Sequence, residues 1–215
     1  KHPGLDDGLS LAARYTDKPA APTPSFAADS VPLPPAPTPS PEFTDVTPGS
    51  NATQSSRNTF IEVSGTLTLR HGNRCRVEEN AFLGNHAKGC GGIRLIGEDH
   101  VVSGNYLEAL DGDKERSAFC FMLGIPDSPE NGYFQVKNAK LINNTVVDCK
   151  SPFLFGFAGD KKATLAPENV YADNIRFTNA PLDGYADQKG FLWDQKDLKR
   201  PAWVDEREAA GPSWK

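Results

Sequence analysis

Asparagine recurs in closely similar surroundings along the chain, in the segments "SSRNTF", "VEENAF", "VSGNYL", "LINNTV" and "YADNIR". In most of them an apolar side chain follows the asparagine within two residues. The five positions are Asn58, Asn80, Asn105, Asn144 and Asn174, with spacings of 22, 25, 39 and 30 residues. Repeats of about twenty residues with variable insertions are typical of solenoids in which each repeat forms one coil. The sequence therefore predicts a solenoid.

Between the asparagines lie short apolar segments with the composition of β-strands, "TLTLR", "GGIRLIG", "SAFCFMLG" and "SPFLFGF". Gly (19 residues) and Pro (18 residues) are both frequent, which favours an all-β fold with many turns. We expect residues 66–70, 93–96, 119–123 and 153–157 to stack as parallel strands. Asparagine favours turns by itself, but five matched settings favour side-chain amides that stack and hydrogen-bond from coil to coil.

The composition divides the chain into three parts. Residues 1–57 are rich in Pro, Ala and Thr and are expected to be an extended segment or linker. Residues 58–180 contain the coils. Residues 181–215 lose the repeat, carry the three tryptophans, and are expected to be irregular and to pack on the solenoid. Insertions at residues 111–117 and 126–137 interrupt the repeat, and loops of this kind typically wall a groove on a solenoid surface.

Charge and cysteine content argue against several classes of protein. The net charge of −5 and the pI of about 5.4 argue against a nucleic-acid-binding surface. No apolar run is long enough to span a bilayer, so no membrane partner is expected. The four cysteines, Cys75, Cys90, Cys120 and Cys149, are spread singly without a CxxC pair, which argues against a zinc site. Buried thiols are favoured over disulfides.

Two arginines occupy matching positions in neighbouring repeats. Arg70 lies ten residues before Asn80, and Arg94 lies eleven residues before Asn105. If the adjacent aliphatic side chains point inward, both guanidinium groups point outward from strands about 4.8 Å apart. Like charges this close are unfavourable unless an anion is shared between them, and a polyanion with a carboxylate on every sugar fits that requirement. The alternative is an internal acidic partner, for which the candidates are Glu98, Asp99 and Glu115.

The segments "NTFIEVSGTLTLRHGNRCRVEENAFLGN" and "GGIRLIGEDHVVSGNYL" closely resemble polysaccharide lyase family 6, the family of alginate lyases and chondroitinase B. The resemblance covers about residues 58–179, and "TLTLRHGN" and "GGIRLIG" are its most specific elements. It implies a right-handed parallel β-helix, in agreement with the repeat. It also implies β-elimination on an acidic polysaccharide of the alginate or dermatan type, and a secreted or periplasmic location.

β-Elimination requires a base that removes the C5 proton beside the sugar carboxylate, a group that stabilises the enolate-like charge, and stabilisation of the leaving O4. In the family these tasks fall to a lysine, a calcium ion and an arginine. By the motif, Arg70 matches the catalytic arginine, His71 is the histidine that follows it, and Arg94 matches a substrate-binding arginine. Asn73 and Lys88 are further substrate-binding candidates beside the same groove.

The chain departs from the family at the base and at the metal. The family's lysine lies 21 residues before the arginine, where this sequence has Gly49, and the calcium ligands belong to coils further upstream, where this sequence is Pro-rich. No metal ligands are therefore assigned, and the chain by itself is expected to show little or no lyase turnover. Lys88 and Lys114 are lysines near the groove, but the motif does not align either with the base.

Three interpretations stay open. The chain is part of a lyase whose β-helix a second chain completes, or a rearranged chain, or a non-catalytic relative that binds an acidic polysaccharide. A solenoid whose stacked arginines satisfy only local acids is the structural alternative.

Overall fold

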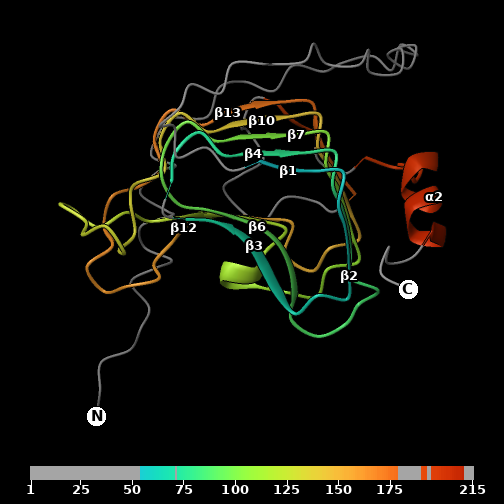
Figure 1. Cartoon of the computed structure of the whole chain (residues 1–215), viewed down its shortest axis with the longest axis horizontal. Helices are drawn as coiled ribbons and strands as arrows, with labels where there is room; N and C mark the ends of the chain where they lie inside the picture. Colours follow the sequence, from blue (N-terminus) through green and yellow to red (C-terminus); the bar gives the residue numbers. More distant parts are fainter. Residues whose placement is uncertain (1–53, 71, 179–189, 193–194, 211–215) are drawn as a thin grey trace, which may run out of the picture.

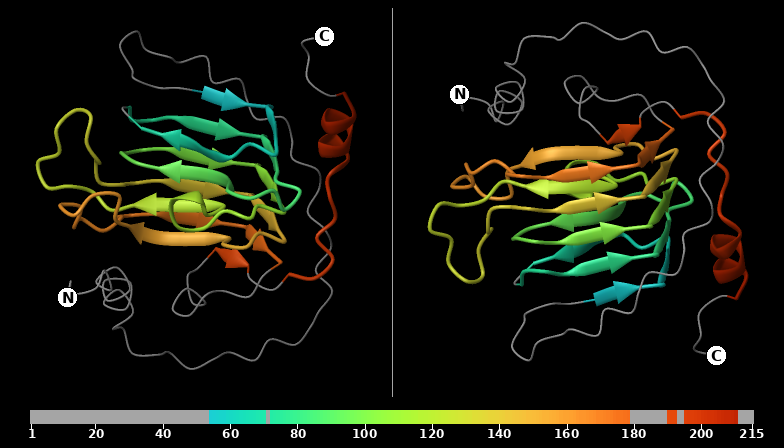
Figure 2. Two further views of the ribbon diagram at one scale, coloured as in Figure 1. Left: turned by 90° about the horizontal axis from the view of Figure 1, so that it is seen from below. Right: turned by 90° about the horizontal axis from the view of Figure 1, so that it is seen from above.

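The computed structural model describes residues 54–70, 72–178, 190–192 and 195–210. Their strands form three parallel sheets, here called A, B and C, which are the three sides of a coiled chain (Figures 1 and 2). Each of the first four coils contributes one strand to each sheet in turn, so the predicted parallel β-helix is confirmed. The Pro-rich segment lies almost entirely outside the described residues, and its extended character stays a prediction.

Sheet A contains β1 (Gln54–Ser56), β4 (Arg76–Glu78), β7 (Val101–Ser103), β10 (Lys140–Ile142) and β13 (Tyr171–Asp173). Sheet B contains β2 (Thr59–Ile61), β5 (Ala81–Leu83), β8 (Tyr106–Glu108), β11 (Thr145–Val147), β14 (Ile175–Phe177) and β15 (Phe191–Leu192). Sheet C contains β3 (Gly65–Leu69), β6 (Cys90–Leu95), β9 (Phe119–Met122) and β12 (Phe153–Phe157).

The strands of sheet C are the four predicted from the apolar segments, and they pair in the predicted order. Thr68 is opposite Arg94, which is opposite Cys120 in turn. Leu154 of β12 is opposite Cys120 on the other side. This register fixes which side chains share the outer face of sheet C.

A left-handed residue marks the corner from sheet A to sheet B in every coil. The φ angles of Arg57, Glu79, Gly104, Asn143 and Asn174 lie between 51° and 64°. Such a residue reverses the local curvature of the chain, so that a sharp corner forms without a long loop. The residue that directly follows this left-handed corner occupies an equivalent place in each coil. In the first four coils it is an asparagine whose side chain stacks on the next.

Four asparagines form a continuous ladder at that position. Oδ1 of Asn80 accepts hydrogen bonds from the backbone N–H (3.0 Å) and Nδ2 (3.2 Å) of Asn58. Oδ1 of Asn105 accepts the same pair from Asn80, both at 3.0 Å. Oδ1 of Asn144 accepts them from Asn105 at 3.0 and 2.9 Å. The predicted amide ladder is thus confirmed for these four residues.

The fifth predicted member, Asn174, was assigned to the wrong position. Thr145 is opposite Arg176, so the residue in register with Asn144 is Ile175. Asn174 lies at the left-handed corner and donates from Nδ2 to Oδ1 of Asn143 at 2.6 Å. The Asn143–Asn144 doublet made the two alignments indistinguishable by residue type, and only the pairing of the strands resolves them.

The interior of the solenoid is apolar along its whole described length. Phe60 and Phe82 stack with their ring centroids 4.7 Å apart, and Phe121 packs on Phe153 at 5.3 Å. Cys75, Cys90, Cys120 and Cys149 are all buried thiols, as predicted. Burial raises the pKa of Cys120 and Cys149 to about 12, which keeps both thiols protonated and unreactive at neutral pH.

One histidine is fully buried. His100 accepts from the backbone N–H of Cys75 at Nδ1 (3.2 Å) and donates from Nε2 to the carbonyl oxygen of Ile96 (2.9 Å). These two bonds require the neutral ring with its proton on Nε2. Burial lowers the pKa of His100 below its usual 6.5, because the interior disfavours the charged imidazolium.

The C-terminal part of the chain returns along the outside of sheet B. β15 pairs with β14, so a strand of the solenoid lies beyond residue 180. Helix α2 (Ala202–Ala210) follows and lies against the flank of the solenoid (Figure 1). Its Val204 is fully buried against Ala81 and Tyr106. The division of the chain at residues 57 and 180 stays a prediction.

Arg200 fixes the start of this returning segment. Its Nε donates to Oε2 of Glu108 on β8 (2.8 Å), and its Nη1 donates to Asp205 (3.1 Å) and Glu208 (2.5 Å) of α2. The arginine therefore ties the helix to the third coil. No helix in the described part of the chain is long and apolar enough to cross a membrane.

Replacing Asn105 by Ala should lower the free energy of unfolding by about 3 kcal/mol or more. The change removes a fully buried rung, so the backbone N–H of Asn80 loses its acceptor and the amides of Asn80 and Asn144 and the carbonyl oxygen of Val77 each lose one hydrogen bond, at roughly 1–3 kcal/mol for each buried group left unsatisfied. Urea unfolding followed by circular dichroism measures the loss. Asn174→Gly is the control, because glycine readily adopts the left-handed φ of 51° at this corner and the bond to Asn143 is solvent-exposed, and it should cost less than about 1 kcal/mol. Equal losses in the two variants would contradict the ladder.

The free energy of unfolding should fall as the pH is lowered from 7 to 5. The unfolded chain takes up a proton on His100 near pH 6.5, whereas the folded chain resists protonation until its lower pKa is reached. Between the two pKa values this single group contributes a slope of up to about 1.4 kcal/mol per pH unit. Urea unfolding at several pH values should show that His100→Gln flattens this slope. An unchanged slope would assign the pH dependence to other groups.

Candidate functional site

Arg70 and Arg94 lie on the outer face of sheet C. Leu69 and Leu95 point into the core, and Thr68 is opposite Arg94, so Arg70 and Arg94 have the same outward parity on adjacent strands. Arg70 is two residues further along than the partner of Arg94. Strand spacing and rise per residue then separate the two Cα atoms by about 8 Å, within reach of one carboxylate-bearing ligand. The register inferred from the sequence holds for this pair.

Two insertions wall this face at its two ends. The short helix η1 (Lys114–Arg116) covers the beginning of the strands, where a side chain at Gly91 would lie 2.6 Å from the carbonyl oxygen of Arg116. The loop of residues 124–137 covers the other end, where a side chain at Gly124 would lie 2.5 Å from Cα of Gln135. Both glycines are therefore required by close backbone approach. The outward row between the two insertions is Thr68, Arg94, Cys120 and Leu154, and Cys120 is fully buried there in a small cluster on which Tyr133 packs.

The loop holds Arg70 in place. The Nη2 group of Arg70 donates to the carbonyl oxygen of Asn131 at 2.6 Å. Its guanidinium carbon lies 4.7 Å from the centroid of the Tyr133 ring, a cation–π contact. Arg70 is half-buried, so it is less open to solvent than a free surface arginine.

A pocket of about 400 Å³ opens beside Arg70 at this end of sheet C. Its polar lining is of mixed charge, and the residues that give it this character are Arg70, Asp127, Asn131, Tyr133, Asp160 and Lys162. Arg94 does not line this pocket but lies in the outward row next to it. The arrangement offers two cations, an aromatic ring and two carboxylates, which is a suitable set for a sugar that carries both an acid and hydroxyl groups.

Neither arginine is neutralised by a carboxylate in the described part of the chain. No acidic oxygen of the described residues lies within ion-pair distance of Arg70 or Arg94. The Nε atoms of both are buried without a hydrogen-bond partner. The acids considered as internal partners, Glu98, Asp99 and Glu115, therefore form no ion pair with Arg70 or Arg94. A buried donor without a partner is costly, so the fold holds both guanidinium groups in place at some loss of stability.

The structure does not bring the other predicted site residues to the same place. Lys88 lies in the turn before β6, six residues from Arg94 in the sequence, and does not line the pocket. Lys114 belongs to η1, the wall at the beginning of the strands. Oδ1 of Asn73 accepts from the backbone N–H of Glu98 at 3.0 Å, so this side chain fixes a corner. His71 lies outside the described residues, and its role stays a prediction.

Five polar residues of the pocket were missed by sequence reasoning, namely Asp127, Asn131, Tyr133, Asp160 and Lys162. They lie on loops between coils, where no periodic pattern marks them. The one available signal was the 39-residue spacing of the asparagines, which identified the insertion that carries Tyr133 but not the residues within it.

The described residues do not form a site for the calcium ion that the family implies. Nowhere among them do three or more His, Cys, Asp or Glu side chains come together as metal ligands. Asp127 and Asp160 line the same pocket but have no third acidic partner there. No part of the proposed elimination chemistry is therefore assigned to a metal ion.

A parallel β-helix with outward arginines in a walled groove defines a class of carbohydrate-active protein, and the comparisons with known proteins place the chain within it. Residues 41–201 match the family described as Chondroitinase B, three quarters of the chain. The chain belongs to this family, whose solved members here are polysaccharide lyases of family 6. No curated protein matches the chain.

Solved structures agree with the family. The PL6 family alginate lyase AlyGC has 36% sequence identity and a TM-score of 0.52, over 68% of this chain and 20% of its own. A mannuronic acid specific family 6 lyase from human gut microbiota has 19% identity and a TM-score of 0.53, over 75% of this chain and 42% of its own, which supports the fold alone. The chain thus spans about a fifth of the length of AlyGC.

Replacing Tyr133 by Ala should expose the guanidinium of Arg70. The cation–π contact is worth about 0.5–1 kcal/mol at such a site, so modification of Arg70 by phenylglyoxal should become about two- to fivefold faster. Peptide mass spectrometry after timed labelling measures this rate. Tyr133→Phe keeps the aromatic ring, so Arg70 in this variant should be modified at the same rate as in the protein without a substitution. If Ala and Phe label alike, the ring does not hold Arg70.

Proposed function

We propose that the outer face of sheet C binds the carboxylates of an acidic polysaccharide of the alginate type, as part of a lyase site that cleaves by β-elimination. The observation that carries this proposal is the pair Arg70 and Arg94. Two cations stand on adjacent strands with buried, unpartnered Nε atoms and without a carboxylate among the described residues. The unfavourable approach of two like charges is relieved when the guanidinium groups bind uronate carboxylates.

The substrate class is supported by the family and by AlyGC, which is described as an alginate lyase and is 36% identical over the aligned part. The family name also includes chondroitinase, so a dermatan-type polymer is the second substrate to test. Both are large extracellular polyanions. We accordingly propose a secreted or periplasmic location for the protein.

The described residues account for part of the chemistry of elimination. Arg70, at the mouth of the pocket, is placed to donate to a developing charge on the leaving oxygen or on the sugar carboxylate. Arg94 orients the neighbouring uronate. The position that the motif assigns to the base is Gly49, which has no side chain that could remove a proton. Lys162 is the one lysine of the described residues that lines the same pocket as Arg70.

Binding without cleavage is the alternative function, and the missing base favours it for the chain by itself. The groove and its two arginines serve binding equally well. Elimination additionally needs a base within about 3 Å of the C5 proton. The two functions therefore differ in turnover and not in affinity.

Replacing Arg70 or Arg94 by Ala should weaken the binding of alginate oligosaccharides about ten- to hundredfold, because a charged hydrogen bond contributes roughly 1.5–3 kcal/mol. Isothermal titration calorimetry with size-defined oligosaccharides measures the affinity. Arg176→Ala is the matched control, since Arg176 points outward from sheet B, and it should bind normally. Normal affinity in both site variants would refute the binding face.

Turnover is measured in the same preparations by the ultraviolet absorbance of the unsaturated product. The chain by itself should show little or none. Robust elimination would contradict this expectation and would require a base other than the residue at the motif position. Lys162→Met would then test the pocket lysine directly.

A further inference from the structure

The loop of residues 124–137 carries the one Asn–Gly pair of the sequence, Asn131-Gly132. The other twelve asparagines are each followed by a residue with a side chain. An asparagine amide is attacked most easily by the backbone nitrogen of a following glycine, because glycine has no side chain that hinders the approach. The attack gives a cyclic succinimide, which water converts to aspartate or isoaspartate. Asn131 is therefore the place where this chain most readily gains a negative charge.

The side chain of Asn131 has the freedom that this attack requires. Asn131 is exposed and lines the pocket beside Arg70. Its side-chain amide makes no hydrogen bond with the rest of the described chain, so rotation about χ1 and χ2 can bring Cγ to the nitrogen of Gly132. The amides of the buried ladder are instead held by several hydrogen bonds each, as in Asn80 and Asn105.

The contact between Arg70 and this loop acts on the attacking nitrogen. Nη2 of Arg70 donates to the carbonyl oxygen of Asn131 at 2.6 Å, and this carbonyl belongs to the same peptide unit as the nitrogen of Gly132. The nitrogen attacks after it has lost its proton, and resonance spreads the resulting negative charge onto the carbonyl oxygen. A guanidinium held at that oxygen stabilises the charge as it develops, as the donors of an oxyanion hole do.

One hydrogen bond opposes this activation. The N–H of Gly132 donates to the carbonyl oxygen of Pro129 at 2.8 Å, and the bond is lost when the nitrogen is deprotonated. A bond between neutral groups corresponds to a factor of about 2–10 in rate, and a bond from a charged donor to a factor of about 10–100. Because the charged donor outweighs the neutral bond, Asn131 should react about five- to tenfold faster in the folded chain than in an unstructured peptide.

Both products place a carboxylate next to Arg70. In aspartate the new carboxylate is on the side chain of the residue whose carbonyl oxygen already binds the guanidinium. In isoaspartate the chain continues through the side-chain carbon, so the former backbone carbonyl becomes the free carboxylate. The oxygen that accepts from Nη2 then carries a full share of the negative charge. A guanidinium binds such a group more strongly than a neutral carbonyl.

We propose that Asn131 is a site of spontaneous deamidation assisted by Arg70, and that the carboxylate formed pairs with Arg70 and competes with uronates for it. The nitrogen of Gly132 bonds to Cγ of Asn131, its proton goes to the departing Nδ2 group, and ammonia leaves. Water then breaks one of the two C–N bonds of the ring, and nothing is oxidised or reduced. The competition with uronates rests on the proposed function, whereas the modification and the pairing do not.

The rate of modification tests the first part. The full chain and a peptide of residues 126–136 are kept in mildly alkaline buffer, and conversion of each asparagine is followed by peptide mass spectrometry. Asn131 should be converted about five- to tenfold faster in the chain than in the peptide. Asn85 and Asn138 are internal controls, because both are exposed but not followed by glycine, and they should stay largely unmodified.

Arg70→Met removes the charged donor and should lower the rate at Asn131 to that of the peptide or below. A rate in the unsubstituted chain that does not exceed the peptide's overturns the assisted reaction. A rate that Arg70→Met fails to lower overturns it as well, since the loop and not the guanidinium would then set the reactivity.

The pairing is tested with Asn131→Asp, which supplies one product, and Asn131→Gln, which keeps a neutral amide. Modification of Arg70 by phenylglyoxal should be about two- to fivefold slower in Asn131→Asp than in Asn131→Gln, as expected for an ion pair near the surface. Equal rates overturn the pairing.

Affinity for alginate oligosaccharides should be lower by the same factor in Asn131→Asp than in Asn131→Gln, and equal affinities overturn the competition. If neither variant nor the unsubstituted chain binds the oligosaccharides, the proposed function fails. The rate of deamidation and the labelling of Arg70 still decide the modification and the pairing in that case.

Discussion

The rest of the structure depends on one repeated hydrogen-bonding unit, an asparagine amide that accepts from the coil before and donates to the coil after. Because the side-chain period of a strand is two, a slip of one residue between coils would reverse every side chain on sheet C. Each buried rung makes such a slip costly, since it would leave several buried polar groups without partners. The outward parity of Arg70 and Arg94 is therefore a consequence of a ladder on a different corner of the coil.

The groove combines a rigid floor with a more irregular wall. Arg94 stands on the central part of sheet C between two paired strands, whereas Arg70 follows the last residue of β3 and depends on the loop of residues 124–137 for its position. One cation is thus placed by the fold and the other by an insertion. A ligand that binds both guanidinium groups is therefore sensitive to the position of the loop relative to sheet C.

Sequence reasoning succeeded where periodicity carries the information. The repeat located four rungs, four strands of sheet C and the parity of the two arginines, because all three follow from a regular coil. It failed where the chain leaves that period. Asn174 was misplaced by one residue because Asn143 and Asn144 are adjacent. Tyr133 and Lys162 lie in loops, whose geometry is set by packing and not by pattern.

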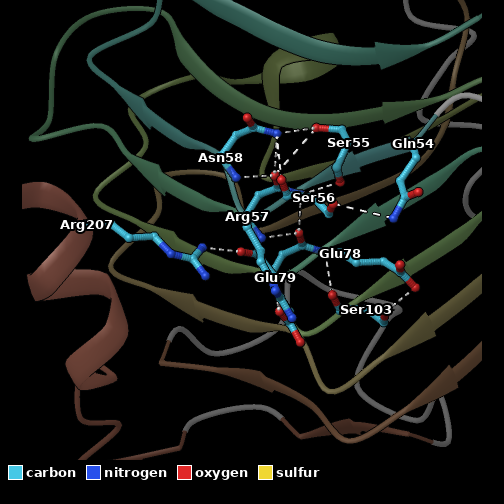
Figure 3. A network of polar contacts seen from close by, with 11 residues as sticks. Gln54, Ser55, Ser56, Arg57, Asn58, Glu78, Glu79, Ser103 and Arg207 are labelled. Carbon is cyan, nitrogen blue, oxygen red and sulfur yellow. Dashed lines mark hydrogen bonds and ion pairs between the residues drawn. The ribbon is translucent and has the colours of Figure 1, made fainter. Parts of the chain in front are cut away.

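The tie made by Arg200 and α2 gives the solenoid a preferred order of unravelling. The segment that leaves the last coil is fastened to Glu108 of the third coil, and Arg207 of α2 donates to the backbone of Glu79 in the second. Unfolding that starts at the C-terminal side must break these contacts before a single coil is released. Helix α2 also lies against β2 of the first coil, and Arg57 of that coil pairs with Glu79 of the second (Figure 3). The returning segment therefore acts as a clasp over the first three coils, and these coils cannot separate from one another until α2 is released.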